Sequence, residues 1–213
     1  MDYHGRQRLS TTSYAILGLL VSGPHTGYEL ARQMQLAFDY VWPRARSGLY
    51  VEPKRLVTAG LASVSHERHG ARPRAIYTAT DTGREEFARW LDSAPSPATI
   101  EIEAILRVMF ADRGSKAQLV AALENLRAQA LELQGRALRQ GAEYSSEGPL
   151  SDRLHLVATG GRFVHEYAAM LRRYAEWALA EVAGWPSSGA RAAPNGQRIL
   201  QEQLSLFAPT SSG

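Results

Sequence analysis

Basic and hydroxyl-bearing side chains are concentrated in the stretch WPRARSGLYVEPKRLVTAG, residues 42–60. If this stretch is read as a helix, at about 100° per residue, Leu49, Pro53 and Leu56 fall on one side. The opposite side holds Ser47, Tyr50, Val51 and Lys54, which are polar, aromatic or basic apart from Val51, and Arg44 and Arg46 lie near the first turn. Such donors and positive charges suit phosphates and the edges of nucleic-acid bases. An ordinary surface helix with solvated charges is the alternative.

Positive charge is concentrated around the same stretch. The whole chain has a formal net charge of only +3. Residues 42–74, however, hold two acidic residues, Glu52 and Glu67, against seven basic ones: Arg44, Arg46, Lys54, Arg55, Arg68, Arg72 and Arg74. This local excess favours a polyanionic partner such as double-stranded DNA.

The chain lacks the side-chain constellations of the common enzyme classes. It has no cysteine, which excludes thiolate nucleophiles and cysteine-ligated metals. His165-Glu166 begins a zinc-protease pattern, but Ala169 stands where the second histidine ligand would be. His66 and His69 have ligand spacing, yet they fall in a predicted hairpin and are better interpreted as solvated. The sequence therefore predicts no enzyme, no metal site and no cofactor, and it assigns no ligand site.

Helices are predicted on both sides of a tight turn, ahead of the basic stretch. Residues 9–23 indicate a helix that is buried on more than one side. Thr26 and Glu29 match a capping box, in which each side chain bonds the backbone of the other. The helix that they open has an apolar stripe formed by Leu30, Met34 and Phe38. With residues 42–60 as the third helix, the order is that of a helix-turn-helix.

Pro53 is unfavourable inside a helix, because it removes one hydrogen bond and clashes one turn back at a cost of about 3 kcal/mol. We expect either a kink near residues 50–52, or a short reading helix followed by a second helix with Pro53 in its first turn. Either arrangement leaves residues 46–50 as the groove-facing part.

A β-hairpin is predicted directly after the third helix. Residues 61–65 and 75–79 are β-prone runs joined by a loop that contains Gly, Pro and Arg. A hairpin in this position is a wing, and it would offer Arg68, Arg72 and Arg74 to phosphates or to a minor groove. Thr26 and Tyr28 are the expected contacts from the supporting helix.

A Pro- and Ser-containing linker, residues 93–99, is predicted to separate a domain of residues 1–92 from a helical domain of residues 100–185. Apolar residues of the second domain recur at alternating spacings of three and four, as in helices packed along their length. We assign one such seam to dimerisation: Leu154, Val157, Gly161, Val164, Ala168, Leu171 and Ala175. An intramolecular hairpin is the alternative. Residues 186–213 are rich in Gly, Ser, Ala and Pro and are expected to form a flexible tail.

Several motifs in combination resemble PadR-family transcriptional regulators. They are Ala15-Ile-Leu-Gly-Leu-Leu, Gly23-Pro24-x-x-Gly27-Tyr28-Glu29-Leu30, Trp42-Pro43, Leu49-Tyr50-x-Glu52, Lys54-Arg55-Leu56, Gly60-Leu61 and Arg72-Pro-Arg-x-x-Tyr77-x-x-Thr80-x-x-Gly83-Arg84. This resemblance covers residues 9–92, and residues 99–183 look like the helical C-terminal domain of the longer, virulence-activator-type subgroup. It implies a homodimeric winged helix-turn-helix DNA binder, usually a repressor, which a small molecule releases from DNA in some members.

The expected fold is mainly α with a small β wing: a winged helix-turn-helix domain followed by an all-α dimerisation domain. We expect a regulator that binds a near-palindromic operator as a homodimer, with a small aromatic compound as a candidate effector. Arg46, Ser47 and Tyr50 are expected to read base edges, while Arg44 and Lys54 hold phosphates. A winged-helix protein-interaction module that does not bind DNA is the alternative.

The sequence also predicts where the protein works. The longest apolar run, residues 14–21, is far shorter than the roughly 18 residues of a membrane span. The first ten residues lack the apolar core of a signal peptide. We therefore expect a soluble, cytoplasmic protein with no membrane partner.

Overall fold

The computed structural model describes residues 9–38, 42, 46–69, 72–143 and 153–206, and it divides the chain into two compact units, residues 1–98 and 99–213. At the edges of these segments only the backbone is described, at residues 36–38, 46–47, 68–69, 72–73, 140, 143 and 206. No helix in the described part of the chain is long and apolar enough to cross a membrane.

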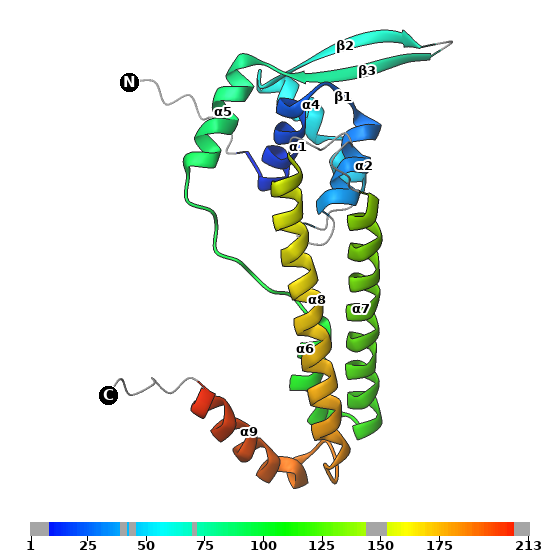
Figure 1. Cartoon of the computed structure of the whole chain (residues 1–213), viewed down its shortest axis with the longest axis vertical. Coiled ribbons are helices and arrows are strands. Elements are labelled where there is room, and N and C mark those ends of the chain that lie inside the picture. Colours follow the sequence, from blue (N-terminus) through cyan, green and yellow to red (C-terminus); the bar gives the residue numbers. More distant parts are fainter. Residues whose placement is uncertain (1–8, 39–41, 43–45, 70–71, 144–152, 207–213) are drawn as a thin grey trace. The chain divides into compact units, whose positions relative to one another are not determined.

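The first unit surrounds one central helix (Figure 1). Its elements are α1 (Thr11–Ser22), β1 (His25–Thr26), α2 (Gly27–Phe38), α3 (Arg46–Leu49), α4 (Glu52–Thr58), β2 (Ala62–His69), β3 (Arg72–Ala79) and α5 (Asp81–Asp92). Ile16, Leu17 and Leu20 of α1 are completely buried, and α2, α4, α5 and β3 all pack against this helix. α1 is therefore the core that holds the other elements in place.

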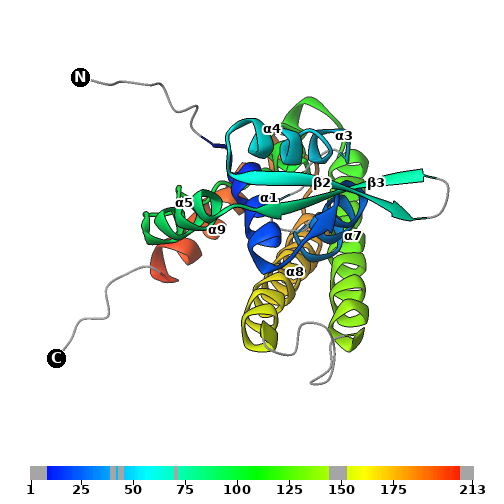
Figure 2. The ribbon, with the colours of Figure 1, turned by 90° about the horizontal axis from the view of Figure 1, so that it is seen from above.

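Three antiparallel strands form a sheet in the order β1-β3-β2. β2 and β3 run side by side as a long ribbon, which is the predicted wing, and both strands are longer than the sequence indicated (Figures 1 and 2). β1 was not predicted. It has only two residues, His25 opposite Tyr77 and Thr26 opposite Ile76, which is too short to show an alternating pattern.

The end of α4 is fixed by Gly60, whose φ of 73° lies in the left-handed region. Leu61 N–H donates to the Leu56 carbonyl at 2.9 Å, and Gly60 N–H donates to the Val57 carbonyl at 3.0 Å. These two bonds form a Schellman motif, in which glycine is favoured because it has no Cβ. The motif turns the chain directly from α4 into the wing.

The second unit is an antiparallel helical pair with shorter helices around it. Its elements are α6 (Glu103–Met109), η1 (Ala111–Arg113), α7 (Lys116–Glu143), α8 (Leu154–Ala183), η3 (Ala190–Ala192) and α9 (Ala193–Leu206). Leu119 and Leu123 pack with Ala178 and Val182, whereas Leu126 and Ala130 pack with Leu171 and Ala175. The pairing partners descend along α8 as they ascend along α7, so the two helices run in opposite directions.

The expected fold class is confirmed: the chain is mainly helical with a small antiparallel sheet, and a helical region follows the winged helix. Two finer predictions need correction. The seam assigned to dimerisation is largely used within the chain, because Val164, Ala168, Leu171 and Ala175 are buried by the chain's own atoms. Leu154 and Val157 are half-buried, and Gly161 is exposed. The tail predicted to be flexible contains α9, whose Leu, Gln, Arg and Glu residues favour a helix within a segment otherwise rich in Gly, Ser and Pro.

Candidate nucleic-acid interface

The basic stretch folds as two short helices, α3 and α4, with a turn at Tyr50 and Val51. Pro53 stands in the first turn of α4, where a missing N–H removes no helical hydrogen bond. This is the second of the two arrangements expected from the sequence. The proline therefore starts a helix here and breaks none.

The two sides of this segment differ in burial as the helical reading predicted. Leu49, Pro53 and Leu56 are fully buried against the core. Tyr50 is 41% exposed, and Lys54 is also exposed. The apolar side thus anchors the segment, which leaves an aromatic ring and an ammonium group facing outward.

Four parts of the first unit line one shallow hollow on its surface. The lining residues come from the end of β1, from the start of α2, from the α3–α4 segment and from β3: Thr26, Gly27, Tyr28, Tyr50, Lys54, Arg74, Ala75 and Tyr77. The Tyr50 ring lies against the start of α2, since a Cβ built on Gly27 would be 3.7 Å from Tyr50 Cδ1. The fold therefore brings together five predicted contact residues that are far apart in the sequence.

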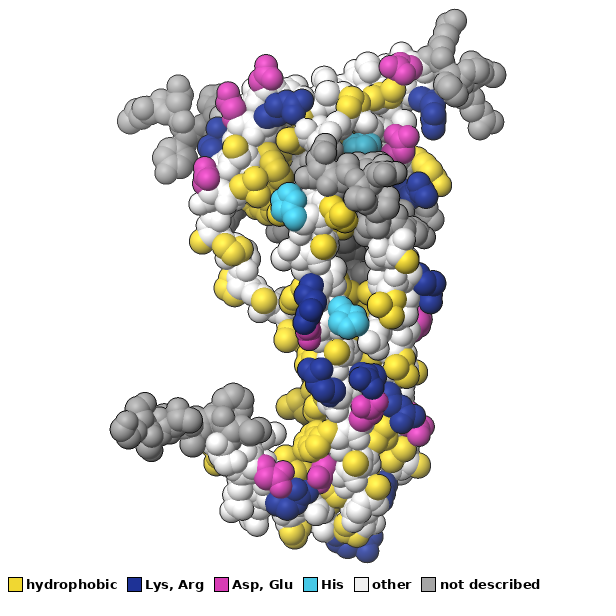
Figure 3. Space-filling view, viewed as in Figure 1, with side chains coloured by type: hydrophobic (Ala, Val, Ile, Leu, Met, Phe, Trp, Pro, Cys, Tyr) yellow, Lys and Arg dark blue, Asp and Glu magenta, His cyan; other side chains and the backbone are white. Residues whose placement is uncertain are grey.

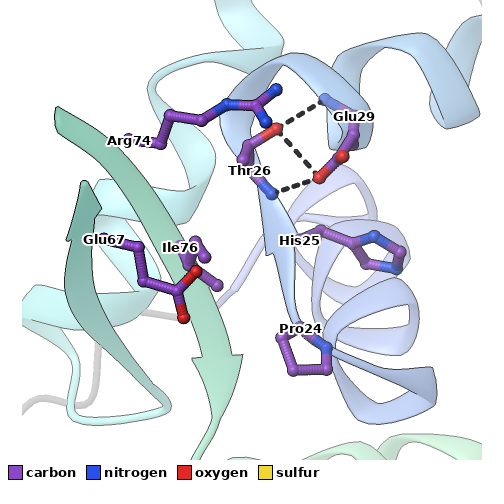
Figure 4. Close-up of a pocket in the computed structure, with 7 residues that line it drawn as sticks. All are labelled: Pro24, His25, Thr26, Glu29, Glu67, Arg74 and Ile76. Carbon is purple, nitrogen blue, oxygen red and sulfur yellow. Dashed lines mark hydrogen bonds between the residues drawn. The ribbon is translucent and has the colours of Figure 1, made fainter. Parts of the chain in front are cut away.

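The capping box at the start of α2 forms as predicted (Figure 4). Thr26 N–H donates to Glu29 Oε2 at 2.7 Å, the Thr26 hydroxyl donates to the same oxygen at 2.9 Å, and Glu29 N–H donates back to Thr26 Oγ1 at 3.2 Å. The bond from the Thr26 backbone lowers the pKa of Glu29 most, followed by the bond from the Thr26 hydroxyl, and the nearby Arg74 charge lowers it further.

Arg74 projects from β3 toward the beginning of α2, whereas Glu67 on the paired strand lies directly across the ribbon (Figure 4). The Arg74 side chain is exposed. One face of the ribbon thus adds a positive charge to the edge of the hollow, beside Thr26 and Tyr28. Glu29 and Glu67 lie beside Arg74, so the exposed cations that this surface offers to a phosphate backbone are Arg74 and Lys54.

The side chains of five predicted contacts are outside the described part of the structure. Arg44 lies outside the described residues altogether. For the other four only the backbone is described: Arg46 and Ser47 begin α3, Arg68 lies in β2 and Arg72 begins β3.

The sequence pattern of the transcriptional regulator PadR-like family matches residues 16–89, which covers α1 through most of α5. Residues 16–89 therefore contain a domain that is similar to the PadR-like family. The chain is 32% identical over 99 residues to the negative transcriptional regulator PadR of Bacillus subtilis, a match that covers 46% of this chain and 54% of that protein. The matched segment spans about half the length of the curated relatives.

Solved structures of PadR proteins share the fold over a longer range. Bacillus subtilis PadR in complex with operator DNA superposes with a TM-score of 0.65 and 26% identity, covering 81% of this chain and 99% of that one. The same protein in complex with p-coumaric acid superposes with a TM-score of 0.60 and 25% identity, covering 82% of this chain and 99% of that one.

Within the PadR-like domain, the buried carboxylate of Glu52 went unrecognised in the sequence. It lies three residues after Leu49 and four before Leu56, a spacing that puts it on the apolar side of the segment. Charged side chains normally face solvent, so the spacing alone does not predict that Glu52 is buried. Its partner Ser13 on α1 is separated from it by 39 positions and carries no motif.

Proposed function

We propose that this chain is a DNA-binding transcriptional regulator, acting in the cytoplasm, that docks the exposed side of α3 and α4 in the major groove of an operator. One observation carries the proposal: Tyr50 and Lys54 of the α3–α4 segment and Arg74 of β3 converge on one surface, while the opposite side of the segment is buried. Side chains with donors and positive charge, held on a rigid back, are what groove binding requires. The similar PadR structure in complex with operator DNA supports the same role.

Repression is the proposed direction of regulation. The relative from Bacillus subtilis is named a negative transcriptional regulator. A repressor needs only to occupy its operator, so no activating surface is required. A small aromatic acid is the proposed class of effector, because PadR of Bacillus subtilis has been solved with p-coumaric acid.

A homodimer is proposed because α8 carries a second apolar stripe that this chain leaves uncovered. Leu156, Phe163, Met170 and Trp177 are exposed by 57%, 60%, 39% and 41%, and consecutive members are seven residues apart. Hydrophobic side chains stand exposed along this helical pair (Figure 3). A seven-residue repeat is the spacing with which one helix packs along another. A second copy of α8 supplies such a helix in a two-fold arrangement.

Two winged helices linked in this way would read two half-sites about one helical turn apart, roughly 34–36 Å. Each additional set of base contacts multiplies the preference for the operator over other DNA. A near-palindromic operator follows from the two-fold symmetry.

The proposal is tested by selecting duplexes from a random pool with the full chain and then measuring affinity against salt concentration. Lys54→Ala and Arg74→Ala are expected to weaken binding to every duplex and to reduce the slope of log affinity against log salt by about 0.9 per lost phosphate contact. Arg107→Ala, an exposed arginine on α6, serves as the control and should leave the slope unchanged. A pool that yields no preferred sequence would instead favour a protein-interaction module.

A further inference from the structure

A buried carboxylate connects the central helix to the reading segment, and the proposed DNA contacts do not include it. Glu52, the first residue of α4, is only 7% exposed. Its Oε2 accepts a hydrogen bond of 2.6 Å from the Ser13 hydroxyl of α1, and its Oε1 accepts one of 2.9 Å from Arg55 Nη1. A carboxylate in such a position is tolerated only where donors compensate for lost water, and these two donors do so.

The hydrogen bonds of this carboxylate extend to the N-terminal cap of α1. Ser10 Oγ lies 2.9 Å from Ser13 Oγ and accepts a bond from Ser13 N–H. A serine hydroxyl has a single proton, and Ser13 donates its proton to Glu52. The hydroxyl of Ser10 therefore donates to Ser13, and the hydroxyl of Ser13 donates to Glu52 at the start of α4.

A second tether joins the same turn of α1 to the other end of the reading segment. Trp42 Nε1 donates to Thr12 Oγ1 at 3.0 Å. Thr12 and Ser13 are neighbours, so one turn of α1 holds the chain at Trp42, before α3, and at Glu52, after it.

Polar tethers matter at the N-terminal end of α4, because the Schellman motif at Gly60 fixes only its C-terminal end. Its N-cap residue, Val51, makes no side-chain capping bond. The apolar contacts of Leu49 and Leu56 keep one side of the segment against the core, but they are non-directional and therefore permit small rotations. Hydrogen bonds weaken steeply when their angles change. The bonds of Glu52 therefore fix how α4 is rotated about its axis, and with it the directions of Tyr50 and Lys54.

We propose that Glu52 and Ser13 are positioning residues for operator discrimination, an inference that rests on the proposed function. They set the angle at which the reading segment presents Tyr50 and Lys54 to the groove. Attraction between a cation and a phosphate changes slowly with distance, whereas a hydrogen bond to a base edge is lost within about an ångström. A small rotation of α4 therefore affects sequence preference far more than it affects general affinity for DNA.

The test uses the full chain with Ser13→Ala and with Glu52→Gln. Dissociation constants are measured for the selected operator and for an unrelated duplex of equal length. The ratio compared between variants is the constant for the unrelated duplex divided by the constant for the operator, so it falls when discrimination is lost. Binding to the operator is expected to weaken about tenfold, comparable to one mismatched base pair, while binding to the unrelated duplex changes less than about twofold. A ratio of the two constants that stays unchanged in both variants would overturn the proposal.

Matched controls separate positioning from general loosening of the fold. Arg55→Gln removes the exposed partner of Glu52, and Arg89→Gln removes an ion pair of the same i, i+3 spacing from α5. The first should lower the ratio and the second should not. An equal fall in both would mean that any lost surface ion pair has this effect, and the proposal would be wrong. Thr12→Val, which removes the acceptor of Trp42 with little change in shape, should lower the ratio as well.

Circular dichroism and thermal melting establish that each variant is folded. If Glu52→Gln does not fold, Ser13→Ala decides, because it deletes a single hydroxyl. Combining both substitutions should cost no more discrimination than the worse single change, since Glu52→Gln weakens and Ser13→Ala removes the same hydrogen bond; additive losses would count against the link. An unmodified chain that selects no duplex would refute the proposed function, whereas variants that keep full selectivity would refute the positioning role alone.

Discussion

Tyr50 is the aromatic residue best placed to distinguish one base pair from another. Its ring packs on the backbone of Gly27, and two-fifths of the side chain remains exposed. Tyr50→Ala is therefore expected to blur the sequence selected from random duplexes, with a loss of about 1–3 kcal/mol in discrimination at the base pairs that it contacts. Tyr50→Phe separates the hydroxyl from the ring, because it keeps the packing. A selected sequence that is identical for all three proteins would remove Tyr50 from the reading set.

At the residue scale, the sequence predicted which side of the reading segment is buried. Leu49, Pro53 and Leu56 share one side at helical spacing, and burial follows because that side is apolar. Glu52 lies on the same side and is buried, although its side chain is charged. Its burial depends on the hydroxyl of Ser13, a residue distant in sequence, and no local pattern carries such information.

At the element scale, the capping box predicts a pH-dependent contribution to the stability of α2. The bonds from Thr26 lower the pKa of Glu29 in the folded chain below its ordinary value of 4.5. A lowered pKa in the folded state stabilises the protein above the unfolded value, and this contribution is lost as the pH falls through the folded value. Glu29→Gln should therefore reduce the free energy of unfolding at pH 6, by about 0.5 kcal/mol, and have a smaller effect at pH 3.

Urea denaturation of both proteins at the two pH values measures this difference. Glu85→Gln, which removes an exposed carboxylate from α5, is the control for the loss of a negative charge. A difference between Glu29→Gln and the unmodified chain that is equally large at both pH values would show that the ionised carboxylate is not responsible.

The start of α5 lies so close to the start of the wing that only glycine fits. A Cβ on Gly83 would be 2.0 Å from the Leu61 carbonyl oxygen, a backbone atom that cannot move independently. Gly83→Ala should therefore destabilise the first unit by about 1–3 kcal/mol or more. A Cβ on Gly160, within α8, meets nothing within 4 Å, and Gly160→Ala should stabilise the helix by about 0.5–1 kcal/mol. Thermal melts of the two variants should shift in opposite directions.

The elements with strong local signals were the ones that the sequence could predict. The capping box predicted α2, and two β-prone runs around a Gly-containing loop predicted the ribbon of β2 and β3. β1 and α9 were missed for different reasons. β1 is a strand through its pairing with Ile76 and Tyr77 of β3, which are distant from it in the sequence. α9 lies in a segment rich in Gly, Ser, Ala and Pro, although the helix itself contains several Leu and Gln residues. Arg198 pairs with Glu181 of α8 and, within α9, with Glu202.

At the scale of the whole molecule, the sequence indicated helical packing in the second half but not which surface faces which partner. A heptad seam has the same spacing whether the partner helix comes from the same chain or from a second copy. The buried seam through Leu171 and Ala175 packs in the second unit of its own chain, on α7. Only the folded chain reveals the second stripe on α8, because exposure distinguishes the two.

The exposed stripe of α8 predicts how assembly and operator binding depend on one another. Charges placed on the stripe by Phe163→Glu with Met170→Glu should disfavour a second copy, because a buried unpaired carboxylate costs several kcal/mol. Sedimentation should then shift from dimer to monomer. Ala158→Glu, exposed on another side of α8, is the control and should leave the dimer intact.

The monomeric variant should still bind a single half-site weakly, but it should lose the additional affinity for the complete palindrome. Should the double variant remain dimeric, or bind the palindrome as tightly as the unmodified chain, the stripe is not the surface that joins the two copies.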